Sequence, residues 1–122
     1  NKAIPICTGD LFNWLNSDDY YEPDALKTIG EEFMANPDLL VVSGYENRFN
    51  IENNTNKIVE GTIVKNTLEE TLYYGWIGQP TTFFHKKVIT RLGKLNTSLH
   101  YLMDAEWWMN FLMIFGKDKV KL

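Results

Sequence analysis

Two acidic segments carry residue types that could do chemistry. The segment Asn16 to Asp19 ends in two aspartates directly after a short apolar run. Hard divalent cations such as Mg²⁺ or Mn²⁺ bind one or two carboxylates together with substrate phosphates, so Asp18 and Asp19 are candidate metal ligands. Asp104 precedes an aromatic-rich stretch, where a carboxylate at the edge of a cleft could take a proton from a bound hydroxyl. Glu106, in the same turn, is the other candidate base.

Each acidic candidate also has a structural interpretation. Asp18 or Asp19 could simply turn the chain, and Asp104 could cap the helix that follows it. Glu106 could complement the positive end of that helix dipole.

Aromatic side chains are the third chemical feature. Sugar rings stack their apolar faces on indoles, while sugar hydroxyls need polar partners such as Gln79. Trp76 lies between Gly75 and Gly78 in an expected loop and is the best ligand candidate. Trp107 and Trp108 could contribute to the same surface, although core packing is the more common role of tryptophans on such a helix.

The first forty residues predict how the acidic segment is held. Residues 11–15 are short, apolar and followed by polar residues, which is typical of a buried strand that ends in a turn. Pro23 is expected at the first position of a helix that Asn36 and Pro37 stop, and residues 39–42 read as a second buried strand. This order predicts a crossover with a parallel strand pair in an α/β sheet flanked by helices.

Local signals place the remaining elements. A surface hairpin is expected around the turn-forming residues 53–56. Thr67 and Glu70 form a potential capping box, and glycines follow two further helical stretches. The expected elements are hairpin arms at 45–50 and 57–64, helices at 67–74, 86–92 and 104–115, and a strand at 119–122.

Composition narrows the classes of protein. The 122 residues are 44% hydrophobic, enough for one domain, and no apolar run approaches the length of a bilayer span. A net charge of -4 argues against a nucleic-acid partner. Cys7 is the only cysteine, which excludes an internal disulfide and a cysteine-based zinc cluster and favours a reducing compartment such as the cytoplasm.

Several segments, read in order, resemble the family-2 glycosyltransferases of the GT-A fold. The resemblance covers nearly the whole chain, and 45–74 is its least specific part. Its first half is a strand, an Asp-rich metal motif and the helix after it; its second half is an acceptor-side segment and the helix that carries a catalytic Asp. These correspond here to Thr8 to Leu11, Trp14 to Asp19, Tyr21 to Leu26, Gln79 to Lys86, and Gly93 to Trp108.

The resemblance implies a partial GT-A mixed sheet with flanking helices and a hairpin excursion, formed by residues 1–122 as one partial catalytic domain. It implies inverting, metal-dependent transfer from a nucleotide-sugar donor to a saccharide or lipid-linked saccharide. The site would work in the cytoplasm or at the inner face of the membrane, as in bacterial polysaccharide biosynthesis. The implied roles are Asp104 as base, Asp18, Asp19 and Asn16 at an Mn²⁺ or Mg²⁺ ion, Ser17 and Asp18 at the donor, and Trp76, Gln79, Glu106 and Trp107 at the acceptor.

Two residues depart from the family pattern. Asn16 stands where the family often has the first Asp of the metal motif, and Met103 stands where many members have a Glu before the base. In that family, the strands that recognise the nucleotide come before the segment that corresponds to residues 1–4, so we expect this sequence to lack them. We therefore expect the chain alone to be a poor catalyst and to self-associate through exposed strand edges. The rival hypothesis is a non-catalytic module that binds saccharide or protein through exposed aromatics.

Overall fold

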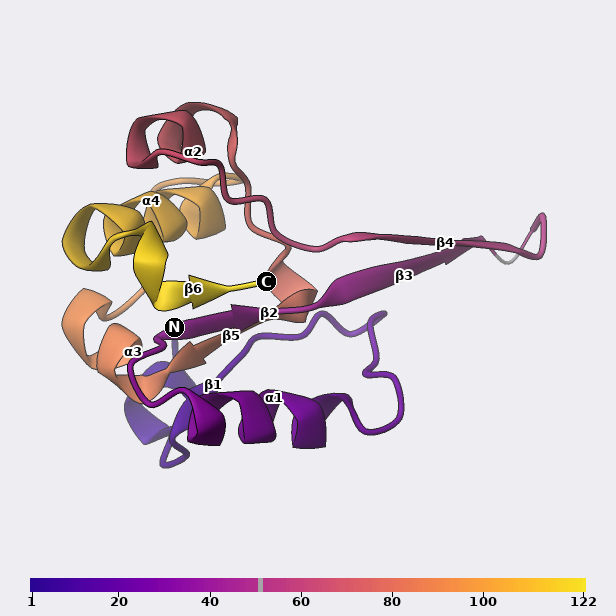
Figure 1. Cartoon of the computed structure of the whole chain (residues 1–122), viewed down its shortest axis with the longest axis horizontal. Coiled ribbons are helices and arrows are strands. Elements are labelled where there is room, and N and C mark those ends of the chain that lie inside the picture. Colours follow the sequence, from indigo (N-terminus) through magenta and orange to yellow (C-terminus); the bar gives the residue numbers. More distant parts are fainter. Residues whose placement is uncertain (51) are drawn as a thin grey trace.

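Two buried strands form the centre of the sheet in the computed structural model, which describes residues 1–50 and 52–122. Strand β2 (Val41–Ser43) pairs antiparallel with β5 (Thr82–His85). Strand β1 (Leu11–Phe12) pairs antiparallel with the other edge of β5, and β6 (Val120–Lys121) pairs parallel with β2. The order is β1-β5-β2-β6 (Figure 1), which confirms a mixed α/β sheet.

The expected direct pairing of the first two strands is wrong. β1 and β2 are both antiparallel to β5, so they point the same way but have β5 between them. β5 suits this central place because Phe83 and Phe84 give it one large apolar side chain on each face. The first strand is also shorter than the expected 11–15, since it ends at Phe12.

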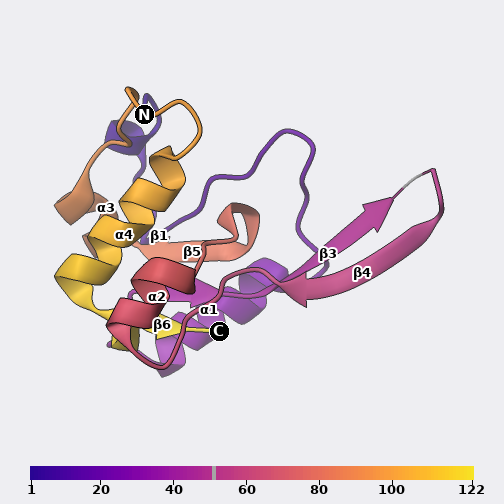
Figure 2. The same ribbon diagram turned by 90° about the horizontal axis from the view of Figure 1, so that it is seen from above.

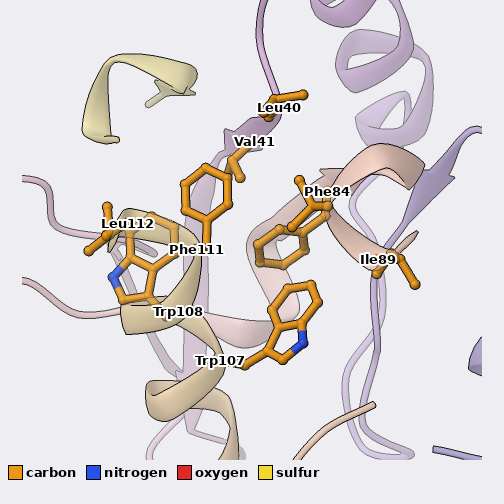
Figure 3. Close-up of a cluster of buried hydrophobic side chains, with 9 residues drawn as sticks. Leu40, Val41, Phe84, Ile89, Trp107, Trp108, Phe111 and Leu112 are labelled. Carbon is orange, nitrogen blue, oxygen red and sulfur yellow. The ribbon is translucent and has the colours of Figure 1, made fainter. Parts of the chain in front are cut away.

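Alternation along β2 and β5 divides the core into two layers. Val42 and Phe83 pack against Ile29 and Phe33 of helix α1 (Ala25–Ala35) on one face. Val41 and Phe84 face the opposite layer, which is formed by α3 (Lys86–Leu92) and α4 (Met103–Phe115). Figure 3 shows the α4 side chains in this layer, including Trp107, Trp108, Phe111 and Leu112, gathered around Val41 and Phe84.

Capping signals explain some of the helix ends. The Thr67–Glu70 capping box precedes α2 (Leu68–Tyr74), as predicted, and glycines with positive φ follow α3 and α4. Helix α1 begins at Ala25 after Asp24, which has a φ of 62°. Pro23 therefore precedes the helix instead of starting it. Leu102 occupies the N-cap position of α4, so the interpretation of Asp104 as the N-cap is wrong.

A hairpin extends away from the sheet, as Figures 1 and 2 show. Its strands are β3 (Tyr45–Asn50) and β4 (Thr55–Glu60), paired from Tyr45 opposite Glu60 to Asn50 opposite Thr55. The predicted hairpin is confirmed, although its second strand begins and ends earlier than the expected 57–64. Beyond it, Ile63 forms an isolated antiparallel bridge with Trp76.

Three single-turn 3₁₀ helices complete the described structure: η1 (Ile4–Ile6), η2 (Gln79–Thr81) and η3 (Lys117–Lys119). Within residues 1–50 and 52–122, no helix is both long enough and apolar enough to cross a bilayer.

Candidate functional site

Asn13 anchors the acidic loop, residues 13–24 between β1 and α1, which carries the acidic motif Asn16 to Asp19. Its amide nitrogen lies 3.1, 3.3 and 2.7 Å from the carbonyl oxygens of Gln79, Pro80 and Thr82, to which it can donate. Its side-chain oxygen accepts a 2.6 Å hydrogen bond from the Tyr21 hydroxyl. The start and end of the loop are therefore tied to each other and to the segment before β5.

The acidic motif and Gln79 form one hydrogen-bonded unit although they are far apart in the chain. Gln79 Nε2 donates to the Trp14 carbonyl oxygen at 2.7 Å and to Asn16 Oδ1 at 3.2 Å. Asn16 Nδ2 in turn donates to Asp19 Oδ2 at 3.0 Å. The Asp19 backbone N–H closes a turn on the Asn16 carbonyl at 3.2 Å, with Ser17 and Asp18 exposed at its centre.

This arrangement changes the interpretation of Asn16. Its amide oxygen already accepts from Gln79, and its amide nitrogen positions the Asp19 carboxylate. Asn16 therefore joins Gln79 to the Asp19 carboxylate, and its place at a metal ion stays a prediction.

A cavity of about 680 Å³ lies between the acidic loop and strand β3. Asp18 and Asp19 line it together with aromatic rings from both sides. The lining residues that concern ligand chemistry are Tyr20, Tyr21, Glu22, Tyr45, Glu46, Asn47, Arg48 and Phe49. The sequence did not predict the β3 wall, because the residues of an exposed hairpin do not indicate which loop the hairpin will face.

The charge of this cavity is mainly negative. Its lining contains the carboxylates of Asp18, Asp19, Glu22 and Glu46 and the guanidinium of Arg48. Arg48 makes a two-pronged contact with Glu46, at 3.0 Å from Nε and 3.1 Å from Nη2. Hydrogen bonding and the charge of Glu46 raise the pKa of Arg48.

Asp104 lies in the first turn of α4, outside the residues that line the cavity. Its Oδ1 accepts a 2.8 Å hydrogen bond from the Ala105 backbone N–H. Among the described residues, no protein group donates to its Oδ2. Glu106 is similar, because its Oε1 accepts from Asn110 Nδ2 one turn along the helix, at 3.0 Å.

Two tryptophans connect the acidic loop to α4. Trp14, two residues before Asn16, meets Trp107 edge-on with ring centroids 5.5 Å apart. Trp107 is only 2% exposed and belongs to the core. Core packing therefore explains Trp107. Its contact with Trp14 holds the start of α4 beside the loop.

Trp76 is the sequence candidate that keeps an accessible ring. It is 49% exposed, and two backbone hydrogen bonds with Ile63, of 3.0 and 3.2 Å, fix its position. Neither Trp76 nor Gln79 lines the cavity. The structure thus joins Gln79 to the acidic motif and leaves Trp76 apart from it.

Asp18 and Asp19 are the candidate ligands for a metal ion. In the described part of the chain, no three His, Cys, Asp or Glu side chains are grouped so that they could hold a metal. Asp18 and Asp19 both line the cavity. Carboxylate oxygens are the ligand type that Mg²⁺ prefers, usually one or two of them together with substrate phosphates and water.

Comparison with known proteins adds no identification. No protein-family model matches the chain, and no curated protein matches its sequence. The residues and their geometry are therefore the basis for assigning a function.

Proposed function

We propose that this protein takes part in inverting sugar transfer from a nucleotide-diphosphate sugar to an acceptor hydroxyl, within a GT-A type of sheet. The observation that carries the proposal is the unit formed by Gln79, Asn16 and Asp19. It joins an acidic loop and a distant polar segment beside a cavity of ligand size. The mixed sheet with helices on both faces is compatible with that fold.

The acidic turn is assigned to the donor. Asp18 and Asp19 would hold Mg²⁺ or Mn²⁺, and the exposed Ser17 hydroxyl would donate to a diphosphate oxygen. When bound, the cation supplies Lewis-acid stabilisation of the charge on the departing diphosphate. Asn16 keeps Asp19 in place, so the carboxylate does not have to be ordered when the donor arrives.

Asp104 is assigned as the general base. Its Oδ1 is oriented by the Ala105 N–H, which leaves Oδ2 to accept the proton of an acceptor hydroxyl. The acceptor oxygen bonds to the anomeric carbon as the bond from that carbon to the diphosphate oxygen breaks. The proton ends on Asp104 and the electron pair leaves with the diphosphate. Glu106, one oxygen of which is likewise engaged by Asn110, is the alternative base.

Metal-linked donor binding tests the assignment of the acidic turn. Calorimetry of the chain with a panel of nucleoside diphosphates should detect weak binding that requires Mn²⁺. Asp18→Asn and Asp19→Asn should each weaken it at least tenfold, whereas Asp38→Asn, an exposed acid before β2, should leave it unchanged. Binding that is indifferent to Mn²⁺, or retained in both variants, would remove the metal assignment.

A second candidate function is saccharide binding without catalysis. The accessible ring of Trp76 and the aromatic lining of the cavity favour it. The two functions separate in calorimetry, because a binding module takes up saccharide with no need for metal or nucleotide and shows no Mn²⁺-linked affinity for diphosphates.

A further inference from the structure

We propose that the outer face of helix α4 pairs with the same face of a second copy of this chain, with the two helices antiparallel about a two-fold axis. The inference goes beyond the proposed sugar transfer and does not depend on it. Three features of the helix carry it: the apolar residues on both of its sides, the spacing of the exposed ones, and the charges at its two ends.

Helix α4 has more apolar surface than the fold buries. The side chains that it places in the core are Trp107, Trp108, Phe111 and Leu112 (Figure 3). On the outer side, Met109 is 46% exposed, Met113 67% and Ile114 45%. A helix that is apolar on all sides is normally buried on all sides. The outer face of α4 therefore has the composition of a contact surface.

The exposed residues of α4 form one stripe. Met109 and Met113 are one turn apart, and so are Asn110 and Ile114. Glu106 stands one turn before Met109 and Asn110, and its Oε1 accepts the 3.0 Å hydrogen bond from Asn110. Side chains at these spacings lie one above the other on the same face of a helix. The stripe is about 12 Å long, with an apolar centre and an acid at its N-terminal end.

Charge makes the stripe complementary to itself when two copies run antiparallel. Lys117 follows the C-terminal end of α4. In an antiparallel pair, Glu106 of each copy lies opposite Lys117 of the other, and Met109 lies opposite Ile114. A parallel pair would place Glu106 against Glu106. Because opposite charges lower the free energy of pairing and like charges raise it, the antiparallel arrangement is favoured. The same patch then serves both copies, as in a closed two-fold dimer.

The partners of these two charges within the chain do not prevent this contact. Lys117 Nζ lies 3.2 Å from Asp118, and the Asp118 side chain is highly exposed. Exposed ion pairs of this kind contribute little, so Lys117 can turn to a second copy. Asp104 and Glu106 lie about 200° apart around the helix. The contact therefore uses Glu106 and does not require Asp104.

Sedimentation equilibrium of the 122-residue chain, without metal or nucleotide, tests the proposal. The chain should form a dimer with a micromolar Kd, because one helical stripe buries less area than a standard interface. Met113→Glu should weaken the dimer roughly tenfold or more. The matched control is Met34→Glu, since Met34 is 77% exposed on α1, across the sheet from α4, and it should leave the Kd unchanged.

Two results would overturn the assignment to α4. The first is a wild type that stays monomeric at millimolar concentration. The second is a dimer that Met113→Glu leaves intact; if Ile58→Glu, at an exposed position of β4, then abolishes it, the hairpin is the contact instead.

Exchange of the two charges tests the antiparallel arrangement. Glu106→Lys and Lys117→Glu should each weaken self-association roughly tenfold, because like charges then meet at both ends of the pair. An equimolar mixture of the two variants should dimerise about as tightly as the wild type, since each lysine then faces a glutamate of the other variant. A mixture of the folded variants that stays monomeric would overturn the antiparallel pairing.

Discussion

Replacing Gly78 by alanine should destabilise the fold at the point where the hairpin base crosses the segment before β5. A Cβ on Gly78 would lie 1.9 Å from the Gly61 carbonyl oxygen and 2.4 Å from its carbonyl carbon. Both atoms belong to the backbone, so a side-chain rotation cannot relieve the overlap. Either the base of the hairpin or the Gly78 segment has to move.

The cost has two sources. Overpacking of a well-packed site costs about 1–3 kcal/mol. Displacement also strains hydrogen bonds to two buried hydroxyls: Gly78 N–H donates to Thr62 Oγ1 at 3.0 Å, and Thr82 Oγ1 donates to the Gly78 carbonyl at 2.7 Å. Loss of a buried partner costs about 1–3 kcal/mol. We expect Gly78→Ala to lower the free energy of unfolding by about 3 kcal/mol.

Urea unfolding followed by tryptophan fluorescence measures this change, with linear extrapolation to water. Gly30→Ala is the matched control. A Cβ there meets nothing within 4 Å inside helix α1, so it should raise the free energy of unfolding by about 0.5–1 kcal/mol. If Gly78→Ala stays within about 0.5 kcal/mol of the wild type, the close approach to Gly61 does not constrain the fold and the reasoning fails.

Three further changes give separate tests. Thr67→Ala removes the α2 capping box and should cost about 1 kcal/mol in urea unfolding. The Lys86 side chain holds the pKa of Asp10 below its usual range through a hydrogen bond and its positive charge, so Lys86→Met should raise that pKa in an NMR titration. The matching stability, present above the unfolded-state pKa and lost as pH falls through the folded one, should disappear. Tyr21→Phe removes the bond to Asn13 and should cost about 1 kcal/mol. Burial raises the pKa of Tyr21, so the wild type should lose stability as pH rises through it, and the variant should not.

Local signals made several helix ends predictable from the sequence. The capping box at Thr67 and Glu70, Gly93 after α3 and Gly116 after α4 all act within a few residues of the helix they limit. The hairpin was predictable for the same reason, because its turn-forming residues stand between its two strands.

Pairings between distant segments were not predictable in this way. β5 lies between β1 and β2, which are separated from it by many residues, because Phe83 and Phe84 supply apolar groups to both faces of the sheet. Asn13 is similar. In the sequence it is a polar residue inside an apolar run, whereas in the structure its amide contacts three carbonyl oxygens of residues 79–82 and the Tyr21 hydroxyl.

The candidate site was predictable in part. The residue types at 16–19 pointed to a carboxylate pair, and Asn16 stood out as a departure from the resemblance. Its contacts with Gln79 and Asp19 depend on how two loops meet. The β3 wall of the cavity depends on the direction in which the hairpin leaves the sheet (Figure 2), which no local pattern encodes.

The most direct measurement of the central claim is sugar transfer by the product of the encoding open reading frame, with Mn²⁺, nucleotide-diphosphate sugars and saccharide acceptors. Asp104→Asn should lower kcat by about 10²–10⁴, the usual contribution of a general base, with KM for the donor little changed. Asp118→Asn, an exposed acid whose side chain is 89% accessible, should retain full activity. Near-normal turnover in a folded Asp104→Asn variant, or loss of turnover only in Glu106→Gln, would contradict the account.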